Sequence, residues 1–560
     1  MASDQFSLVA AIDIGTTYSG YAFSTVNDFL QNPTKIDDVE SQTFQTCVLY
    51  TPSRSFDSFG YDAEEKYINL EDHDEWYFFT RFKMSLYNST LDRDVQITDF
   101  SGKKRMPLKV ILSDTINYLK LQVLGKCKER NITVDGPAIR WVLTVPSIWN
   151  DQAKQLMREA ARKVGIRKRQ LILALEPEAA SIFHKYENLA GEYGAIQAGI
   201  EYMVVDAGGG IVDIVVHEVQ NDGKQAEVVA STGGAYGGTV VNDAFESLLE
   251  DIVGKQTLDQ FKSHHISDFF NLMRSFEVEK MAIGEDPTDM VKFNIPASLL
   301  STYNSVNPGE NIEENINNQN LSSHVGFHRG QLWMSGSKAE SLFNESVENI
   351  TGHIKKLLED PNIKGISFIV LAEGYSESPL LVNRIQAAAR GIKLHVIGED
   401  MAVLKGAVIF GHSPGTISER ISRFTYGVDT WSRFVEGKHK EEYKVTAADG
   451  SQRCKFAFST FVRKGDSVKT DKISMVRKYT PAASSQNGMN FTIYASEEEP
   501  VHVTDPSCKK IGKFTIDLPE TTGGLDRTVC VMMRAGGTEI DIKAIEEDTE
   551  RCCSTCDFLI

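Results

Sequence analysis

The stretch AAIDIGTTYSGYAF, from Ala10 to Phe23, decides the expected fold of this sequence. An apolar run carries Asp13 near its end, and Gly15 and two hydroxyl residues, Thr16 and Thr17, follow before the chain becomes apolar again. A turn without bulk brings consecutive backbone N–H groups onto an anion, and the hydroxyls add donors at the same place. The stretch therefore predicts a hairpin whose turn can bind phosphate. A single copy is also explained by a tight hairpin turn beside a solvated aspartate.

A second stretch, YMVVDAGGGIVDIVVHEV from Tyr202 to Val219, repeats the plan of a strand, an aspartate, a glycine turn and a second strand. Two such hairpins favour the phosphate interpretation over the plain turn, and they predict a duplicated α/β fold whose halves face each other across a cleft. Asp13 and Asp206 would then meet near the terminal phosphate of a nucleotide, where they could hold Mg²⁺ through water and orient an attacking water. A Rossmann dinucleotide loop is a weaker interpretation, since the glycines lead into a strand and not into a helix.

The composition of the whole chain limits its partners. The 560 residues carry a net charge of -18, which leaves no broad basic face for nucleic acid or for an anionic membrane. The first residues lack the basic region of a leader, and no apolar run reaches the ~18 residues that a membrane helix needs. We expect a cytoplasmic protein, with a nuclear location as the alternative, that neither spans a membrane nor binds nucleic acid.

Changes of pattern along the chain predict five segments. Residues 1–411 alternate short apolar strands with amphipathic helices, as in an α/β domain. Within them, the Asn-rich segment 302–323 has little to bury and predicts a mobile surface insertion. Residues 412–424 are expected to be a linker, and 425–546 change to period-two segments with turn signals, which predicts a smaller antiparallel β-domain. Residues 547–560 predict a flexible tail that contains cysteines.

Two helices and a strand are clear within the α/β segment. DQAKQLMREAARKV, after Asn150, repeats apolar residues at spacings of three and four, and both Asn150 and Asp151 are suitable N-caps. A second long helix is expected in SLFNESVENITGHIKKLLED. The strand ISFIVLAEG follows it and ends in a glycine, as a loop at a ligand-facing sheet edge requires.

The eight cysteines are scattered without paired spacing, which predicts free thiols. In the tail CCSTCDFLI, Cys556 is fifth from the end, whereas a prenylation box needs a cysteine at the fourth position. A reduced tail is therefore favoured over palmitoylation or metal binding.

The motifs resemble those of the 70-kDa heat-shock proteins, within the superfamily of actin, hexokinase and heat-shock ATPases. IDIGTTYSG and VVDAGGGIVD are similar to the family's two phosphate motifs, and WVLTVPSIWNDQAKQLMREAARKVGI and LEPEAASIF are similar to its connecting segment and the stretch that follows. The resemblance covers Ser7 to about Gly411 and looks closest to a divergent branch, the heat shock 70 kDa protein 12-like proteins. It implies an actin-like ATPase fold, ATP or ADP with Mg²⁺ as cofactors, and a β-domain that binds extended peptide.

The resemblance also assigns roles to individual residues. Those that would enclose the β- and γ-phosphates are Gly15, Thr16, Thr17, Tyr18, Gly208, Gly209, Gly210 and Ile211. Those that would surround the metal and the attacking water are Asp13, Glu176, Asp206 and Asp213, with Lys83 as the catalytic lysine and with Asp13 and Asp206 holding the metal through water. The glycine pair behind the phosphates is Gly237 and Gly238, and the adenosine side has Glu277, Lys280, Gly284, Gly374 and Asp400.

Two of these assignments have ordinary alternatives. The flanks of Lys83 differ from the family pattern, so an exposed lysine without a role remains an alternative. Glu277 and Lys280 could equally be an ion pair on the solvated face of a helix, since their spacing is i, i+3.

Several positions depart from the family pattern. Ile211 stands where the family has threonine, and the loss of one positioned donor typically lowers a rate about a hundredfold. The departures on the adenosine side are Met281 and Glu377 for two arginines, Gly284 for a serine, and Glu373 and Tyr375 for the glycine and serine that flank Gly374. The linker lacks an acidic-leucine segment and offers only Ile417, Ile421 and Phe424 for docking, and the helical lid is missing. Phosphate binding is therefore better supported than hydrolysis, base recognition or coupling between domains.

Two functions from different classes follow. The first is a chaperone-like ATPase with slow hydrolysis, whose β-domain binds an unfolded peptide or a signalling-protein client. The second is a nucleotide-sensing scaffold that binds ATP or ADP with negligible turnover. A small-molecule kinase is less well supported, because no motif for reading a substrate accompanies the phosphate turns.

Overall fold

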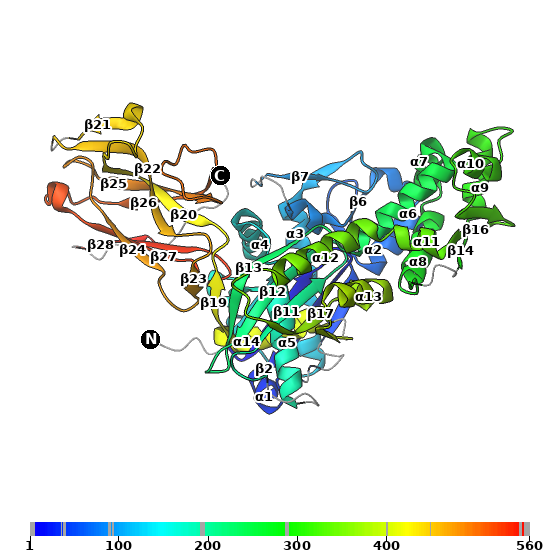
Figure 1. The fold of residues 1–560 in the computed structure, drawn as a ribbon, viewed down its shortest axis with the longest axis horizontal. Helices are drawn as coiled ribbons and strands as arrows, with labels where there is room; N and C mark the ends of the chain where they lie inside the picture. Colours follow the sequence, from blue (N-terminus) through cyan, green and yellow to red (C-terminus); the bar gives the residue numbers. More distant parts are fainter. Residues whose placement is uncertain are drawn as a thin grey trace.

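The computed structural model describes residues 6–34, 36, 41–87, 91, 94–190, 196–285, 290–398, 401–447, 450–547 and 552–553. A mixed α/β part is followed along the chain by a part built of strands, and the two lie side by side (Figure 1). Two large sheets form the centre of the α/β part. Outer elements extend from these sheets on the side away from the strand-rich part (Figure 1).

The first sheet has the strand order β10, β9, β1, β2, β3. Its strands are β1 (Leu8–Ile14), β2 (Tyr18–Thr25), β3 (Ser41–Gln45), β9 (Ile139–Val145) and β10 (Leu171–Leu175). β1 and β2 form an antiparallel hairpin, whereas β9 and β10 run parallel to β1. Helices α3 (Leu108–Glu129) and α4 (Asp151–Lys163) pack together against this sheet and precede β9 and β10 in the chain.

The second sheet has the strand order β18, β17, β11, β12, β13, β19, β23. Its strands are β11 (Glu201–Ala207), β12 (Val212–Val219), β13 (Gln225–Gly234), β17 (Ile366–Ala372), β18 (Lys393–Val396), β19 (Ile417–Ile421) and β23 (Ser467–Lys469). β11 and β12 form an antiparallel hairpin, and β17 runs parallel to β11. The helices that accompany this sheet are α6 (Gly238–Val253), α12 (Asn344–Leu358) and α13 (Pro379–Ala388).

The two sheets share a core. The central strands β1 and β11 are buried on both faces: Val9 and Ala11 from β1 meet Tyr202 and Val204 from β11 in one apolar cluster, and the alternate residues face separate clusters. Helices α5 (Glu176–Ala190) and α14 (Ala402–His412) pack within the shared cluster. A Cβ atom on Gly406 would lie 1.8 Å from the carbonyl oxygen of Ala179, so the two helices can cross this closely only because residue 406 is glycine.

The outer elements extend both sheets. Beside the first sheet they are α1 (Val26–Gln31), β4 (Cys47–Tyr50), β5 (Phe56–Phe59), α2 (Tyr61–Asn69), β6 (Tyr77–Thr80), β7 (Gln96–Thr98) and β8 (Arg105–Pro107). Beside the second they are α7 (Lys255–His264), α8 (Ile266–Lys280), β14 (Met290–Asn294), α9 (Ala297–Val306), α10 (Ile312–Asn318), β15 (Val325–His328), β16 (Gln331–Ser335) and α11 (Gly336–Ser341).

The segment 302–323 differs from the insertion expected from its sequence. It contains the end of α9 and all of α10, and Tyr303, Ile312 and Ile316 are buried in the core beside α6 and α7. The expectation that it has little to bury is therefore wrong. These few apolar residues all pack into the core of the second sheet, which an overall Asn-rich composition conceals.

Helix α4 begins at the first of its two suggested caps. Asn150 has an extended backbone, and its side-chain oxygen accepts a hydrogen bond from the N–H of Ala153 at 2.8 Å. Asp151 is the first helical residue. An N-cap of this kind satisfies a backbone donor that the helix itself cannot pair.

Residues 412–424 are built into the second sheet. Strand β19 pairs in parallel with β13 and antiparallel with β23, which comes from the strand-rich part. Arg420 donates from Nε and Nη2 to the two carboxylate oxygens of Glu178 at 2.6 and 2.7 Å, and from Nη1 to the carbonyl oxygen of Gly536 at 2.6 Å. The expectation of a segment with little to dock is therefore wrong, because backbone pairing and one arginine, not apolar side chains, hold it. We call the contacts of β19 with Glu178, Gly536 and β23 the β19 junction.

The strand-rich part, residues 425–547 with 552–553, is called the β region here. Its strands are β20 (Thr425–Arg433), β21 (Lys444–Thr446), β22 (Gln452–Val462), β24 (Met475–Tyr479), β25 (Gly488–Ser496), β26 (Cys508–Asp517), β27 (Val529–Arg534), β28 (Asp541–Glu546) and β29 (Cys552–Cys553). They form sheets of order β21, β22, β20, β25, β26 and β24, β27, β28, β29 around one apolar core. Of the expected tail, β29 pairs with β28, and 548–551 and 554–560 lie outside the described residues.

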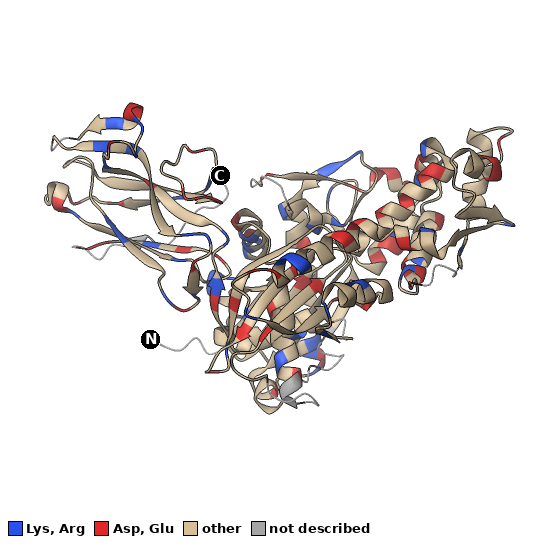
Figure 2. Cartoon of the chain, viewed as in Figure 1, with Lys and Arg blue, Asp and Glu red and all other residues tan. Residues whose placement is uncertain are grey.

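The distribution of charged residues and the state of the cysteines agree with what the sequence predicts. Figure 2 shows basic and acidic residues interspersed over both parts of the molecule. The cysteines whose side chains are described, Cys47, Cys127, Cys454, Cys508 and Cys530, carry free thiols. Within the described ranges, no helix combines the length and the apolar character that crossing a membrane would require.

Candidate functional site

A cavity of about 290 Å³ lies where the turns of the two hairpins, β1–β2 and β11–β12, meet the start of helix α6. The residues singled out from the sequence that line it are Asp13, Gly15, Thr16, Thr17, Tyr18, Lys83, Glu176, Asp206, Gly208, Gly209, Gly210, Ile211, Asp213, Gly238, Glu277, Lys280 and Gly374. Gly237 and Gly284 are not part of the lining, and Asp400 lies outside the described residues. Residues far apart in the sequence are thus brought to one place.

The glycine turns pack against each other too closely for side chains to fit. A Cβ atom on Gly209 would lie 2.6 Å from Thr17 Oγ1, and one on Gly210 would lie 2.5 Å from Thr16 Oγ1. A Cβ atom on Gly237 would lie 2.4 Å from the carbonyl oxygen of Gly208. Glycine at these positions lets three separate backbone segments converge on the cavity.

Two backbone N–H groups in the second turn, β11–β12, have no hydrogen-bond acceptor among the described residues. The N–H groups of Gly238 and Thr239, at the start of α6, donate to the carbonyl oxygens of Gly208 and Gly209 at 3.2 and 2.7 Å. The N–H groups of Gly209 and Gly210 have no acceptor in the described part of the chain. Backbone donors are costly to leave unpaired, and adjacent open N–H groups form an anion site. The turn therefore fits a phosphate group.

Lys83 lies inside the cavity. It is 5% exposed, and its Nζ donates to Glu176 Oε1 at 2.7 Å and lies 5.8 Å from the centroid of the Trp149 ring. Burial would lower the pKa of Lys83, but the Glu176 and Asp13 carboxylates raise it to about 12, so the amine stays charged. Burial raises the pKa of Glu176 above its ordinary range, and Lys83 opposes that shift. The alternative of an exposed lysine is excluded by this burial.

Asp13 and Asp213 are each held by a neighbour that the sequence did not indicate. The hydroxyl of Thr144 donates to Asp13, and both the hydroxyl and the backbone N–H of Ser147 donate to Asp213. Thr144 and Ser147 lie at and just after the end of β9, which runs beside β1. Their contribution could have been suspected only from the connecting segment that contains them.

Asp206 differs from these two acids. It is 4% exposed and receives no hydrogen bond from any described side chain or backbone group. Burial, followed by the nearby Glu373 carboxylate, raises the pKa of Asp206 well above its ordinary range. Asp206 is therefore a buried acid that a cation would compensate.

The cavity as a whole is acidic. Six of the residues that line it are acids and two are lysines. A polyphosphate brings further negative charge, so it can be accommodated only with cations. The open N–H groups and the acids together fit a phosphate ligand accompanied by Mg²⁺.

Lys280 is tied to the glycine loop. It is 2% exposed, and its Nζ donates to Glu277 Oε1 at 2.6 Å, to Asn242 Oδ1 at 2.9 Å and to the carbonyl oxygen of Gly238 at 3.3 Å. Asn242 also donates to Glu277 at 2.7 Å. The alternative of an ion pair on a solvated helix face is therefore wrong for Lys280. Sequence reasoning missed Asn242, one helical turn into α6 from Gly238.

Apart from the paired Glu277 and Lys280, the end of the cavity expected to meet a nucleoside has few polar groups. Met281 and Tyr375 line it, and the Tyr375 hydroxyl lies 3.0 Å from Ser346 Oγ. Neither Glu377 nor Gly284 belongs to the lining. The cavity thus has fewer groups that could recognise a base than groups that could bind phosphate.

Two ion pairs join segments of the first-sheet side to segments of the second-sheet side beside this cavity. Arg81 Nη1 lies 2.7 Å from Asp243 Oδ1, and Arg274 pairs with Glu64. A neighbouring cavity of about 340 Å³ is lined by residues from both sides, and it shares Thr16, Thr17, Tyr18 and Glu277 with the first. The two sides are therefore joined by ion pairs next to the glycine turns.

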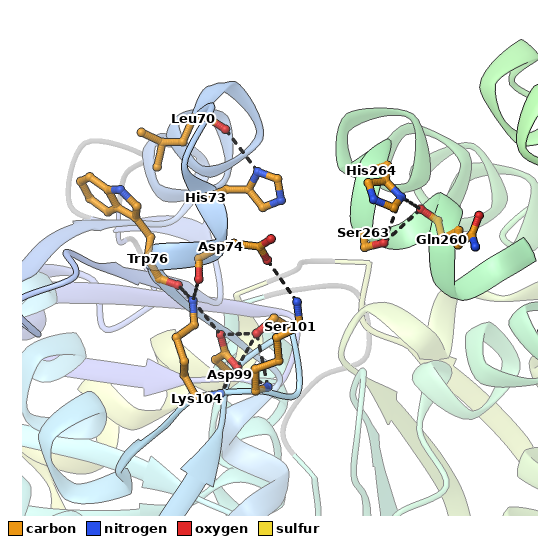
Figure 3. A network of polar contacts seen from close by, with 11 residues as sticks. Leu70, His73, Asp74, Trp76, Asp99, Ser101, Lys104, Gln260, Ser263 and His264 are labelled. Atoms are coloured by element: carbon orange, nitrogen blue, oxygen red, sulfur yellow. Dashed lines mark hydrogen bonds and ion pairs between the residues drawn. The ribbon is translucent and has the colours of Figure 1, made fainter. Parts of the chain in front are cut away.

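Figure 3 shows that each outer extension is also fixed internally. Asp99 accepts hydrogen bonds from Ser101 Oγ at 2.8 Å and from the backbone N–H of Lys104 at 3.0 Å, and Lys104 Nζ donates to the carbonyl oxygen of Asp74 at 2.7 Å. On the facing helix α7, His264 contacts the carbonyl oxygen of Gln260 at 3.0 Å. Among the residues drawn, no dashed line crosses between the two sides.

Comparison with known proteins gives relatives that match nearly the whole chain. Human heat shock 70 kDa protein 12A is 33% identical over an alignment of 627 residues, which covers 99% of this chain and 92% of that protein. Human heat shock 70 kDa protein 12B is 32% identical over 632 residues, with 99% and 91% covered. The chaperone protein DnaK of Psychrobacter cryohalolentis is 23% identical over 439 residues, with 76% and 57% covered. No family model matches the chain.

These relatives define the class as an actin-like ATPase α/β fold of the 70-kDa heat-shock type, in agreement with the mixed α/β structure. Within this class, the chain belongs to the heat shock 70 kDa protein 12 family, given its identity to both human members over 99% of its length. The resemblance predicted from the sequence motifs is confirmed. Membership in the family supports nucleotide binding.

Proposed function

We propose that this protein binds ATP or ADP together with Mg²⁺ in the cavity between the two hairpin turns. The observation that carries the proposal is the packing of Gly209 and Gly210 against Thr17 and Thr16, which leaves adjacent N–H groups without an acceptor in the described chain. The buried Asp206 and the acidic lining supply the reason for the metal.

The proposal includes a finer description of the fold. Residues 1–411 form a duplicated actin-like ATPase domain, and residues 425–546 form a separate β-domain that binds an extended peptide or a protein partner. The support for duplication is that each sheet contributes one antiparallel hairpin with an aspartate beside its glycine turn, β1–β2 in the first and β11–β12 in the second.

Different residues of the cavity would have different roles in phosphate binding and hydrolysis. Bound Mg²⁺ would supply charge neutralisation for the phosphates. Lys83, held in place by Glu176, would face the phosphates with a fixed positive charge. Asp206 would orient the attacking water, while Asp213 is kept in position by Ser147. Ile211, which brings no hydroxyl to this place, is the reason to expect slow hydrolysis.

A nucleotide-sensing scaffold with negligible turnover is the second candidate. The β19 junction favours it, because Arg420 binds both Glu178, two residues from Glu176 of the cavity, and the carbonyl oxygen of Gly536 in the β region. A rigid connection of this kind suits a protein that presents its nucleotide state to a partner. Single-turnover hydrolysis of labelled ATP separates the two candidates: measurable product supports the slow ATPase, and none over hours supports the scaffold.

Calorimetric titration with ATP and with ADP, each with and without Mg²⁺, tests binding itself. We expect heat only when Mg²⁺ is present. Gly209→Val should abolish the signal, because the new side chain would collide with Thr17 and separate the turns. Gly284→Ala is the matched control, since a Cβ atom there meets nothing within 4 Å. An absence of heat at millimolar nucleotide, or normal binding by Gly209→Val, would overturn the proposal.

A further inference from the structure

The neighbouring cavity of about 340 Å³, called the second cavity here, differs from the first in the residues that line it. The rings of Phe100, Phe269 and Phe270 and the thioether of Met273 line the second cavity, and none of these four residues lines the first. Sites for small organic ligands are typically of about 300–1,000 Å³ and lined mainly by apolar and aromatic side chains, with a few polar groups. The second cavity has this size and this lining.

The aromatic residues of the second cavity come from both sides of the molecule. Phe100 follows strand β7 on the first-sheet side, whereas Phe269 and Phe270 lie on helix α8 of the second-sheet side. The ring centroid of Phe100 lies 5.1 Å from that of Phe270 and 6.4 Å from that of Phe269. Phe100 and Phe270 are half-buried. A flat ring stacked beside them would therefore contact side chains from both sides.

The turn that carries Phe100 is held in place by hydrogen bonds. Asp99 accepts from Ser101 Oγ at 2.8 Å and from the backbone N–H of Lys104 at 3.0 Å (Figure 3). The backbone N–H of Phe100 donates to the carbonyl oxygen of Phe78 at 2.7 Å. A site whose groups are already ordered loses less conformational freedom when a ligand binds. Phe100 is therefore a preorganised part of the second cavity.

The charges at the second cavity balance. Three basic and three acidic residues line it, and they are Arg81, Lys262, Arg274, Glu64, Glu246 and Glu277. Each of the three basic side chains already pairs with an acid. A charged ligand would have to compete with these ion pairs, and a charge removed from water without a partner is costly. The lining therefore favours an uncharged ligand, in contrast with the acidic first cavity.

We propose that the second cavity binds an uncharged planar aromatic compound, at a site separate from that of the nucleotide. The compound would stack beside Phe100 and Phe270. The backbone of Gly209 and Gly210, whose N–H groups would meet phosphate, lines only the first cavity, so the two ligands would bind to different groups. The inference goes beyond the proposed function and does not require that the protein binds nucleotide.

The test uses the full-length, nucleotide-free protein and N-phenyl-1-naphthylamine, an uncharged aromatic probe whose fluorescence rises in apolar surroundings. We expect saturable binding of one probe per chain. Phe270→Ala should weaken this binding about tenfold, because a stacked ring and its apolar contact area are lost. Phe56→Ala is the matched control: Phe56 is 38% exposed but lines neither cavity, so the probe should bind as it does to the unmodified protein.

A second variant fills the cavity and leaves the aromatic residues in place. Thr80 is half-buried and lines the second cavity but not the first. Thr80→Phe should therefore abolish probe binding, whereas Thr80→Ser should retain it. Thermal unfolding identifies the variants that remain folded, and Thr80→Phe decides the question if Phe270→Ala does not fold.

The outcomes distinguish this inference from the proposed function. Equal probe affinity in the unmodified protein and in a folded Phe270→Ala or Thr80→Phe variant, or no saturable binding, overturns the inference even if ATP binds with Mg²⁺. Saturating ATP and Mg²⁺ should leave the probe bound. Displacement of the probe by ATP would mean that the nucleotide occupies the second cavity, and it would overturn the separate site. Conversely, probe binding that depends on Phe270, in a protein that binds no nucleotide, supports the inference while the proposed function fails.

Discussion

The cavity and the β19 junction both contain buried charged side chains, but the two regions differ in whether a protein group pairs with the charge. At the junction, the Arg420 guanidinium meets both oxygens of Glu178 and the carbonyl oxygen of Gly536, and the side chains of Arg420 and Glu178 are 9% and 4% exposed. In the cavity, Asp206 is equally buried and receives no such donor from the described residues. Buried charge that is paired holds parts of a fold together, whereas buried charge without a partner indicates a ligand. The predictions below test this difference, from the largest expected effect to the smallest.

Breaking the pair at the junction should have the largest effect. Arg420→Met leaves Glu178 buried without a partner, so the free energy of unfolding should fall by about 3–5 kcal/mol. Chemical denaturation measures the loss. Arg390→Met is the matched control, because Arg390 pairs with Glu359 at 2.7 Å but both side chains are 63% exposed, and its loss should cost about 1 kcal/mol or less. Equal losses in the two variants would contradict the role of the buried pair.

The missing hydroxyl at Ile211 can be restored. Ile211→Thr should raise the single-turnover rate of ATP hydrolysis up to about a hundredfold, as expected for a positioned donor near the γ-phosphate. Ile211 is 6% exposed and packs with the core of the first sheet, so the variant should also lose about 1–2 kcal/mol of stability.

Ile211→Val is the control for this prediction, since valine has the shape of threonine without its hydroxyl. It should share the loss of stability but not the gain in rate. A similar rate in both variants would show that the hydroxyl is not what limits the reaction.

Neutralising the unpaired acid should have the opposite sign to the effect at the junction. Asp206→Asn removes a buried carboxyl whose ionised form is disfavoured by burial and by Glu373, so the nucleotide-free protein should become more stable in EDTA, by about 1 kcal/mol. Glu178→Gln, the same kind of change at a paired acid, should instead destabilise the protein. Thermal unfolding of both variants decides the matter: loss of stability in both would remove the distinction between the two regions.

A weaker effect is expected from pH at the junction. Burial raises the pKa of Glu227 to about 7, although the backbone N–H groups of Ile421 and Ser231 donate to its carboxylate and oppose the shift. Because the folded pKa exceeds the unfolded one, the contribution to stability is present in full below about pH 4.5 and is lost as the pH rises through about 7. The thermal midpoint should therefore fall over this window, and Glu227→Gln should flatten the fall. Glu419→Gln, on strand β19, should leave it unchanged.

The sequence predicted those features that a local pattern contains. The glycine turns at Gly15 and Gly208 were visible because a strand, an aspartate and small residues follow one another within a few positions. Asn150 was likewise visible as a cap next to a periodic helix. The structure brings Lys83 and Glu176 into contact at 2.7 Å; only the family resemblance assigned both residues to one site, and it did not predict that they pair.

Features that depend on distant contacts could not be predicted. Asn242 and Ser147 have roles only because α6 and β9 carry them to Lys280 and Asp213. In the sequence alone, nothing distinguishes Arg420 from other charged residues. Its role depends on the pairing of β19 with β13, which places it against Glu178. Backbone pairing and long-range ion pairs leave no periodic trace in the sequence, which is why the sequence of residues 412–424 predicts only a linker.

Hydrogen–deuterium exchange tests the central claim most directly, because it observes both regions in one experiment. On addition of ATP and Mg²⁺, the amides of Gly15 to Tyr18 and of Gly209 and Gly210 should become strongly protected, since phosphate oxygens would accept their hydrogen bonds. Strand β19 should already be protected without nucleotide and should not change. Unchanged exchange in both glycine turns at saturating ATP and Mg²⁺ would contradict the account.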